Sequence, residues 1–292
     1  MTAIRALLAG IVDYAGLFPP AGLDLVAAAH NYAAYRASDD GWMLGRFVVP
    51  VARLRELVVL LEAKHRGLVP WRLAVLVGDD VQRDLAFALE FNDAHAGVAA
   101  VDCVEAKLAD RDAIERAADA AAGLELFTEL PAGGEVEPLL AVLVSRGVRA
   151  KLRTGGVIPG AFPGTANVVR FMRLCVEAGL PFKATAGLHH PITASYPLTY
   201  EPDAPTNRMF GFVNLFLSAA ALATGAREDE ASRLLEERDA HAFTVRPAAI
   251  RWRDREMGES AIARARSTAA RSFGSCSFRE PVDGVAELWG AP

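Results

Sequence analysis

Lysine is scarce in this chain, and several common signatures of function are missing from it. Only four of its 31 lysine and arginine residues are lysines. The spacings of a nucleotide-binding P-loop and of a dinucleotide-binding GxGxxG turn do not occur, which excludes those two kinds of phosphate site. The three cysteines, Cys103, Cys175 and Cys276, are far apart and form no CxxC or Cys/His pair. This pattern excludes a zinc-finger type of site and favours a reducing, cytoplasmic setting.

Positive charge is not in excess either. The formal net charge is −5, whereas a nucleic-acid partner requires a basic surface, so no nucleic acid is expected. The most apolar stretch, residues 209–226, is diluted by Asn214 and Ser218, which favours a buried core helix over a membrane span. The short N-terminal apolar run is followed at once by Asp13, which is untypical of an export signal. We therefore expect a cytoplasmic protein without membrane contact.

Apolar runs rich in strand-forming residues alternate with segments of helical periodicity, which is typical of repeated strand–helix units. Strands are expected at residues 46–50, 72–77, 98–103, 124–130, 148–153 and 181–186. Helices are expected between them at residues 52–66, 80–95, 110–122, 135–145 and 164–178. A weaker strand at residues 10–14, followed by a helix at 23–37, adds one unit at the start.

The C-terminal third supplies the last unit. Its strand is expected at residues 242–245 or 249–252, before a helix at 256–270. The resulting eight units predict one (β/α)8 barrel of the TIM type over residues 1–292, with an open doubly wound α/β sheet as the alternative. Helices at 208–223 and 228–240 then form an insertion, residues 208–240, before the last strand. Residues 271–292 are expected to form a C-terminal strap or a contact between the subunits of a homo-oligomer.

Two of the rare lysines follow the pattern of functional residues. Lys151 and Lys183 lie near the ends of the sixth and seventh predicted strands, which are neighbours in a barrel. Alternation along a strand puts Lys151 with Arg153 on one face and Lys183 with Thr185 on another. If these faces line the lumen, a neighbouring cation and burial lower a lysine pKa and produce a nucleophilic amine. The alternatives are that the cations hold a phosphate or carboxylate as fixed charges, or form ion pairs inside the barrel.

The two lysine strands also resemble a known family. The segment FKATAG, residues 182–187, resembles the Lys-Thr-Ser-Thr-Gly strand of class I aldolases of the deoxyribose-phosphate type, which act through a Schiff base. The segment KLRTGG, residues 151–156, resembles the second lysine strand of that family. The resemblance is limited to these two strands. It implies that Lys183 is the amine nucleophile and that Lys151 lowers its pKa.

Carboxylates and histidines fall at other strand ends. Asp13 and Glu129 close the first and fifth predicted strands, and His189 and His190 follow the seventh. Glu129 and one of the histidines are expected to move protons. An alternative is that Asp13, Glu129 and a histidine hold a divalent metal, as in metal-dependent carbon–carbon lyases or hydrolases on barrels. Otherwise no cofactor is expected.

Two loops complete the expected site. The glycine-rich turn after the sixth strand contains Gly155 and Gly156, whose amides are placed to bind an anion together with Arg153 and Thr185. The proline-rich stretch 190–207 has no periodicity and is expected to be a lid or an intersubunit arm. The sequence thus predicts an aldolase-like lyase acting on a small anionic carbonyl substrate. A noncatalytic barrel that binds small anions is the alternative from another class.

Overall fold

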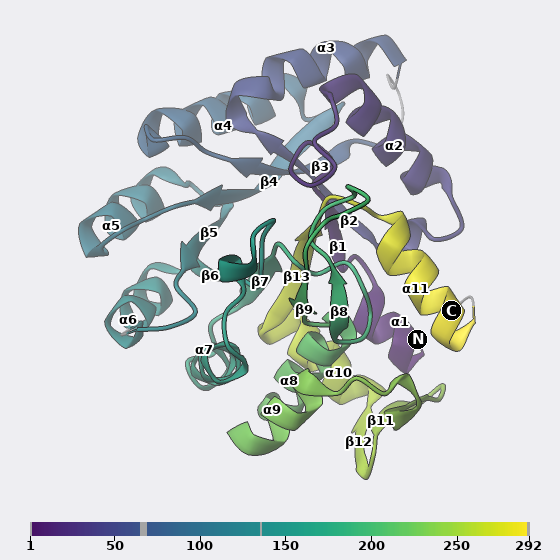
Figure 1. Cartoon of the computed structure of the whole chain (residues 1–292). Coiled ribbons are helices and arrows are strands. Elements are labelled where there is room, and N and C mark those ends of the chain that lie inside the picture. Colours follow the sequence, from purple (N-terminus) through teal and green to yellow (C-terminus); the bar gives the residue numbers. More distant parts are fainter. Residues whose placement is uncertain (1, 65–68, 135, 291–292) are drawn as a thin grey trace.

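The computed structural model describes residues 2–64, 69–134 and 136–290, and its centre is a closed barrel of eight parallel strands (Figure 1). Around the barrel the strands follow the order β1 (Val12–Tyr14), β13 (Ala270–Ser275), β7 (Phe182–Thr185), β6 (Arg149–Arg153), β5 (Glu125–Leu130), β4 (Ala99–Ala106), β3 (Trp71–Leu76) and β2 (Leu44–Pro50). The predicted (β/α)8 barrel is therefore confirmed, and the open doubly wound sheet is wrong.

Helices surround the barrel, and acidic residues begin several of them. The helices between the first seven strands are α2 (Leu25–Ala37), α3 (Leu54–Lys64), α4 (Val81–His95), α5 (Arg111–Ala120), α6 (Glu137–Arg146) and α7 (Thr165–Glu177). The side chains of Asp24, Asp80 and Asp110 each accept a hydrogen bond from the amide three residues on, which satisfies a free N–H group of the first turn. Residues 65, 66 and 135, at the ends of two predicted helices, lie outside the described residues.

The last barrel strand is not where the sequence placed it. Residues 242–245 and 249–252 correspond to β10 (Phe243–Val245) and β11 (Ala249–Trp252), which pair with β12 (Arg255–Gly258) in a separate antiparallel sheet. The helix expected at 256–270 is α10 (Glu259–Thr268), and it precedes the true last strand, β13. The sequence of β13, ARSFGS, reads as polar because Ser272 faces the lumen, where its hydroxyl donates to Asp13 at 2.7 Å.

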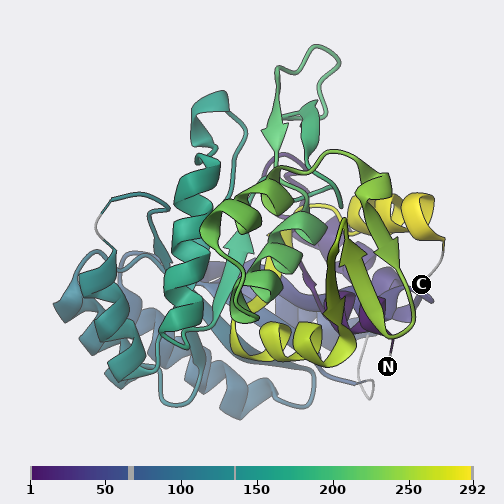
Figure 2. The same cartoon turned by 90° about the horizontal axis from the view of Figure 1, so that it is seen from below.

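The expected C-terminal strap is also wrong for most of its length. Residues 271–292 contain most of β13 and the helix α11 (Arg279–Trp289), so they form a regular strand–helix unit, apart from residues 291 and 292 outside the description. The short helix α1 (Ala3–Leu8) precedes β1, and both chain ends lie close together in both views (Figures 1 and 2). Arg266 of α10 links that helix to the N-terminal segment by donating to the carbonyls of Leu7 and Ala9.

A long connection separates β7 from β13, and it is longer than the predicted insertion at residues 208–240. It contains the hairpin β8 (Ala194–Pro197) and β9 (Thr206–Met209), the helices α8 (Phe212–Ala223) and α9 (Glu228–Glu236), the β10–β12 sheet and α10. Helix α8 is buried from Phe212 to Leu222, which confirms a core helix in the 209–226 stretch. Within the described residues, no helix combines the length and apolar character needed to cross a membrane.

The barrel lumen is layered from its N-terminal end upward. Arg46 pairs there with Asp102 at 2.5 Å and Glu125 at 2.7 Å. Above this layer lies a small apolar cluster that includes Val48, two residues further along β2. Because side chains alternate along a strand, the next inward positions fall at the C-terminal ends of the strands. Charged side chains gather again at that end.

Candidate functional site

The two rare lysines are direct neighbours at the C-terminal end of the barrel. Lys151 of β6 is in register with Lys183 of β7 and, on its other side, with Glu129 of β5. Both lysine side chains point into the lumen, where Lys183 is 1% exposed and Lys151 is 7% exposed. The predicted alternation is therefore realised, and the two amines share one interior.

Six charged side chains of alternating sign form a continuous ion chain across this interior. In order they are Arg153, Glu129, Lys151, Glu105, Lys183 and Asp13. Glu105 joins the two lysines, because one of its oxygens lies 2.6 Å from Lys151 Nζ and the other 2.5 Å from Lys183 Nζ. The amines thus share a carboxylate, and Lys183 has a second one, Asp13 Oδ2 at 2.7 Å.

This arrangement contradicts the expected pKa of Lys183. Burial alone would lower the pKa of its amine, but the adjacent Asp13 and Glu105 carboxylates outweigh burial and raise it. The sequence pattern suggested a neighbouring cation as the dominant influence on this pKa. The structure instead places Glu105 between the two lysines and Asp13 on the other side of Lys183, and these two carboxylates reverse the sign of the shift. Lys183 is therefore held as an ammonium ion.

The cations of the ion chain in turn keep its carboxylates ionised. Burial would raise the pKa of Glu105, yet the ammonium groups of Lys151 and Lys183 lower it to about 2. Burial likewise opposes the ionisation of Asp13, and Lys183 outweighs it and lowers the pKa. For Glu129, burial is outweighed by the hydrogen bond from Arg153 and by Lys151, so its pKa is also lowered.

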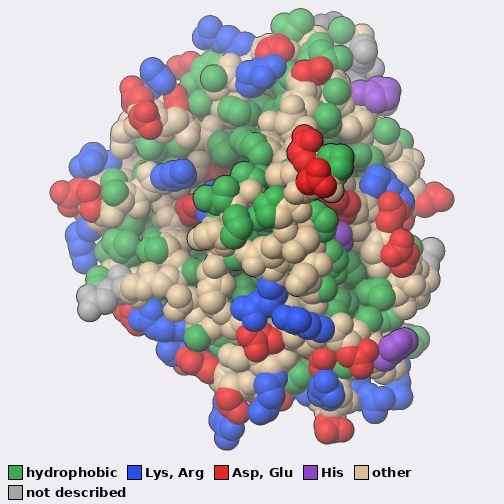
Figure 3. All heavy atoms as spheres, in the orientation of Figure 1, with side chains coloured by type: hydrophobic (Ala, Val, Ile, Leu, Met, Phe, Trp, Pro, Cys, Tyr) green, Lys and Arg blue, Asp and Glu red, His purple; other side chains and the backbone are tan. Residues whose placement is uncertain are grey.

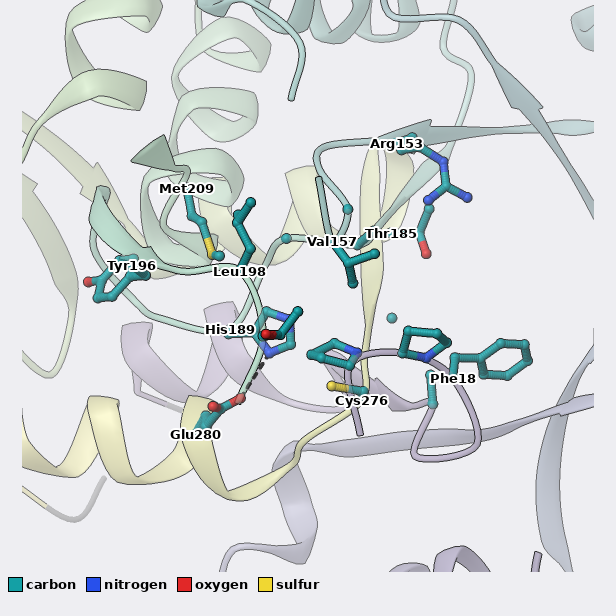
Figure 4. Close-up of a pocket in the computed structure, with 18 of the residues that line it drawn as sticks. Phe18, Arg153, Val157, Thr185, His189, Tyr196, Leu198, Met209, Cys276 and Glu280 are labelled. Carbon is teal, nitrogen blue, oxygen red and sulfur yellow. Dashed lines mark hydrogen bonds and ion pairs between the residues drawn. The ribbon is translucent and has the colours of Figure 1, made fainter. Parts of the chain in front are cut away.

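A central cavity of about 610 Å³ opens above the ion chain. Lys151 and Glu105 are among its lining residues, while Lys183 and Asp13 lie beneath it and do not reach it. Arg153 and Thr185 lie on one side of the cavity, and His189 and Glu280 lie on the opposite side (Figure 4). A ligand in this cavity would therefore meet the Lys151 amine and not the Lys183 amine.

His189 belongs to a hydrogen-bonded group that the sequence did not predict. Its Nδ1 lies 2.9 Å from Glu280 Oε2, and the Tyr200 hydroxyl donates to the same oxygen at 3.2 Å. Cys276 Sγ lies 3.6 Å from that hydroxyl. Glu280 is at the start of α11, in the segment taken for a strap, so its place at the cavity was hidden by the misplaced last strand.

Glu105 is the second residue that sequence reasoning missed. It is at the end of β4, two positions after Cys103, on the same lumen-facing side of the strand. The expected strand ended at Cys103, which left Glu105 in a loop. Extending the alternation by one more pair of residues would have placed this carboxylate beside the lysines.

His190 and the predicted lid lie at the cavity mouth. Burial lowers the pKa of His190, and its ring stacks on Tyr196 with 3.6 Å between ring centroids. Tyr196 belongs to the antiparallel β8–β9 hairpin, so the 190–207 stretch is not without regular structure. The hairpin projects beyond the barrel in Figure 2, and hydrophobic side chains gather around the middle of this face in Figure 3. Tyr196, Leu198 and Met209 are among the residues that line the cavity.

The two predicted anion-binding glycines have different surroundings. Gly155 is packed so closely that a Cβ atom there would lie 2.5 Å from the ring of Phe162 and 3.0 Å from Gly187 Cα. Its lack of a side chain therefore serves the packing of the two loops after β6 and β7. Gly156 lines the central cavity together with Thr185 and Arg153, so these three remain within reach of a ligand.

The residues of the metal-dependent alternative are not gathered in one place. Asp13 contacts Lys183, Ser272 and the Arg46 amide below the cavity, whereas Glu129 pairs with Arg153, and His189 pairs with Glu280. Within residues 2–64, 69–134 and 136–290, no three His, Cys, Asp or Glu side chains are arranged to hold a metal ion. The donor set required for that alternative is thus divided among separate ion pairs.

Comparison with known proteins adds no assignment. The chain matches no protein-family model, and no curated protein is significantly similar to it. The chemistry of the central cavity is therefore the basis on which a function is proposed.

Proposed function

We propose that the protein is an enzyme of the aldolase or lyase type that acts on a small anionic carbonyl compound in the central cavity. Lys151 carries this proposal, because its amine lies at the cavity floor 2.6 Å from Glu105 and 3.5 Å from Glu129. A lysine that faces a carbonyl can condense with it, and adjacent carboxylates can accept and return the protons. Lys183, beneath the cavity, supplies a fixed positive charge to Glu105.

The condensation is balanced without another reagent. The Lys151 ammonium gives up a proton, its nitrogen attacks the carbonyl carbon, and the former carbonyl oxygen leaves as water after receiving two protons from the original ammonium. Glu129, 3.5 Å from the amine, relays these protons, while Glu105 stays ionised between the two lysines. The resulting iminium accepts the electron pair of the bond between the α and β carbons and becomes an enamine, while the β-hydroxyl loses its proton and becomes a carbonyl; aldol addition is the reverse.

Other groups in the cavity can orient the substrate. The Arg153 side chain is 45% exposed and suits the anionic end of a small keto acid. On the opposite side, the His189–Glu280 pair is placed for proton transfer to the part of the substrate that leaves or enters (Figure 4). The cavity volume of about 610 Å³ is within the usual range of sites for small molecules.

Borohydride trapping tests this proposal directly. Protein incubated with pyruvate, 2-oxobutyrate or glycolaldehyde and then reduced should gain the mass of the reduced adduct on the peptide that contains Lys151. The peptide that contains Lys64, the residue that ends helix α3, reports nonspecific reductive alkylation. An adduct on Lys183 would reverse the roles of the two amines, and no specific adduct on either would remove the Schiff-base step.

The Glu280→Gln variant tests the proton-transfer pair. Glu280 orients the His189 ring, so its loss should reduce kcat by about 10²-fold with little change in KM. Burial would raise the pKa of Glu280, but the hydrogen bond from His189 lowers it. Asp283→Asn on the same helix, where Asp283 pairs with Arg279, is the control; an unchanged rate in Glu280→Gln would contradict the assignment.

A further inference from the structure

A second, outer cavity of about 700 Å³ lies next to the central one. Arg153 lines both cavities, and its partner Glu129 lines the outer one, so their ion pair stands at the boundary between the two. The lining of the outer cavity is mostly apolar and includes Leu108, Leu130, Leu139 and Phe162, with Lys107 and Asn167 as polar groups. A ligand that is held at Lys151 and reaches past Arg153 would enter an apolar space that contains one lysine.

Lys107 is a third member of the rare lysine set at this end of the barrel. It directly follows β4, two residues after Glu105, whereas its remaining counterpart, Lys64, ends helix α3. The chain uses arginine for nearly all other positive charges. A lysine presents a compact ammonium that approaches a single anionic group from one direction, while arginine favours a planar, two-pronged contact. The choice of lysine at a cavity wall is therefore informative.

Charge balance indicates what Lys107 can bind. Within the ion chain, three cations already match three carboxylates, so the floor of the central cavity has no surplus positive charge. By contrast, no carboxylate of the described part of the chain forms an ion pair with Lys107. Its charge does contribute to lowering the pKa of Glu129. Lys107 is thus the available cation for a ligand that passes Arg153.

We infer that the outer cavity binds the far carboxylate of an elongated substrate, and that the substrate class is an aliphatic oxo-dicarboxylic acid. The carbonyl end would lie at Lys151, the hydrocarbon chain against the apolar wall, and the second carboxylate at Lys107 and the Asn167 amide. The position of the carbonyl end rests on the proposed function, whereas the second carboxylate site does not depend on it.

A matched pair of ligands tests this inference. 2-Oxoadipate and 2-oxohexanoate have the same carbon chain and the same oxo group, and only the former has a second carboxylate. Calorimetric titration should give about tenfold tighter binding of 2-oxoadipate, as expected for one charge-assisted contact. In Lys107→Gln the two affinities should become equal. Arg246→Gln removes an equal charge at an exposed position outside both cavities and should preserve the preference.

The outcomes separate this inference from the proposed function. Equal affinities in the unmodified chain, or a preference retained in Lys107→Gln, would overturn the second carboxylate site even if Lys151 is trapped by borohydride. A preference for 2-oxoadipate that disappears in Lys107→Gln supports the site, and it does so whether or not an adduct forms on Lys151.

Discussion

A chain carrying Lys151→Met is expected to fold and yet to lose turnover of its carbonyl substrate by about three orders of magnitude or more. Turnover falls because the amine that faces the central cavity is removed. Folding is retained because each carboxylate that Lys151 contacts keeps another cation: Glu105 keeps Lys183 at 2.5 Å, and Glu129 keeps Arg153 at 2.8 Å. The cost in unfolding free energy should therefore be modest, roughly 1–2 kcal/mol.

The matched variant Lys183→Met should show the opposite result, with a large loss of unfolding free energy and no separate loss of turnover. Its removal leaves Asp13 fully buried, and among the described residues its remaining hydrogen-bond donors are the Ser272 hydroxyl and the Arg46 amide. A buried carboxylate without its cation commonly costs about 3–5 kcal/mol. Lys183→Met should therefore lose stability first, and any loss of turnover should accompany the loss of folded protein.

Urea unfolding and steady-state rates, measured on both variants, distinguish these expectations. Far-ultraviolet circular dichroism on the same samples confirms that the rates refer to folded protein. Near-normal turnover in Lys151→Met would contradict its role in the cavity. A Lys183→Met chain as stable as the original but inactive would instead return the reacting role to Lys183, as the aldolase resemblance implied.

The first seven barrel strands were predictable because each combines apolar residues with a regular helical segment behind it. The eighth was not, because β13 contains Arg271, Ser272 and Ser275 in place of an apolar run. Its inward positions face a charged lumen and not an apolar one, so the usual hydrophobic signal is absent. The more apolar β11 was predicted as the last barrel strand, although it pairs outside the barrel.

The candidate site was partly predictable for a similar reason. Residue rarity and strand alternation placed Lys151 beside Lys183 and Glu129, and register confirms this. Alternation along a strand shows which side chains face the lumen but not how far along the barrel axis each one reaches. It therefore did not distinguish the Lys151 amine, which lines the cavity, from the Lys183 amine beneath it. Contacts across the lumen, such as Glu105 between the two lysines, join strands that are not neighbours and leave no local pattern in the sequence.

Glu105→Gln is expected to be among the most destabilising single changes in the barrel, and its effect should depend on pH. A glutamine at this position removes the charge shared by two buried ammonium groups, so the unfolding free energy at pH 7 should fall by about 3–5 kcal/mol. The pKa of Glu105 is lowered from 4.5 to about 2, against the effect of burial, by Lys151 and Lys183.

The sign of the pH effect follows from that lowered pKa. The stability that ionised Glu105 contributes is fully present above pH 4.5 and is lost as the pH falls toward 2, by about 3 kcal/mol in all. Glu105→Gln lacks this titration, so the difference between the two chains should be constant from pH 7 to pH 5 and should then shrink on further acidification. Urea unfolding at several pH values measures it, with the exposed Glu56→Gln as control. A difference that stays the same down to pH 3 would show that Glu105 does not hold the two ammonium groups together, because only an ionised carboxylate in that position links their stability to acid.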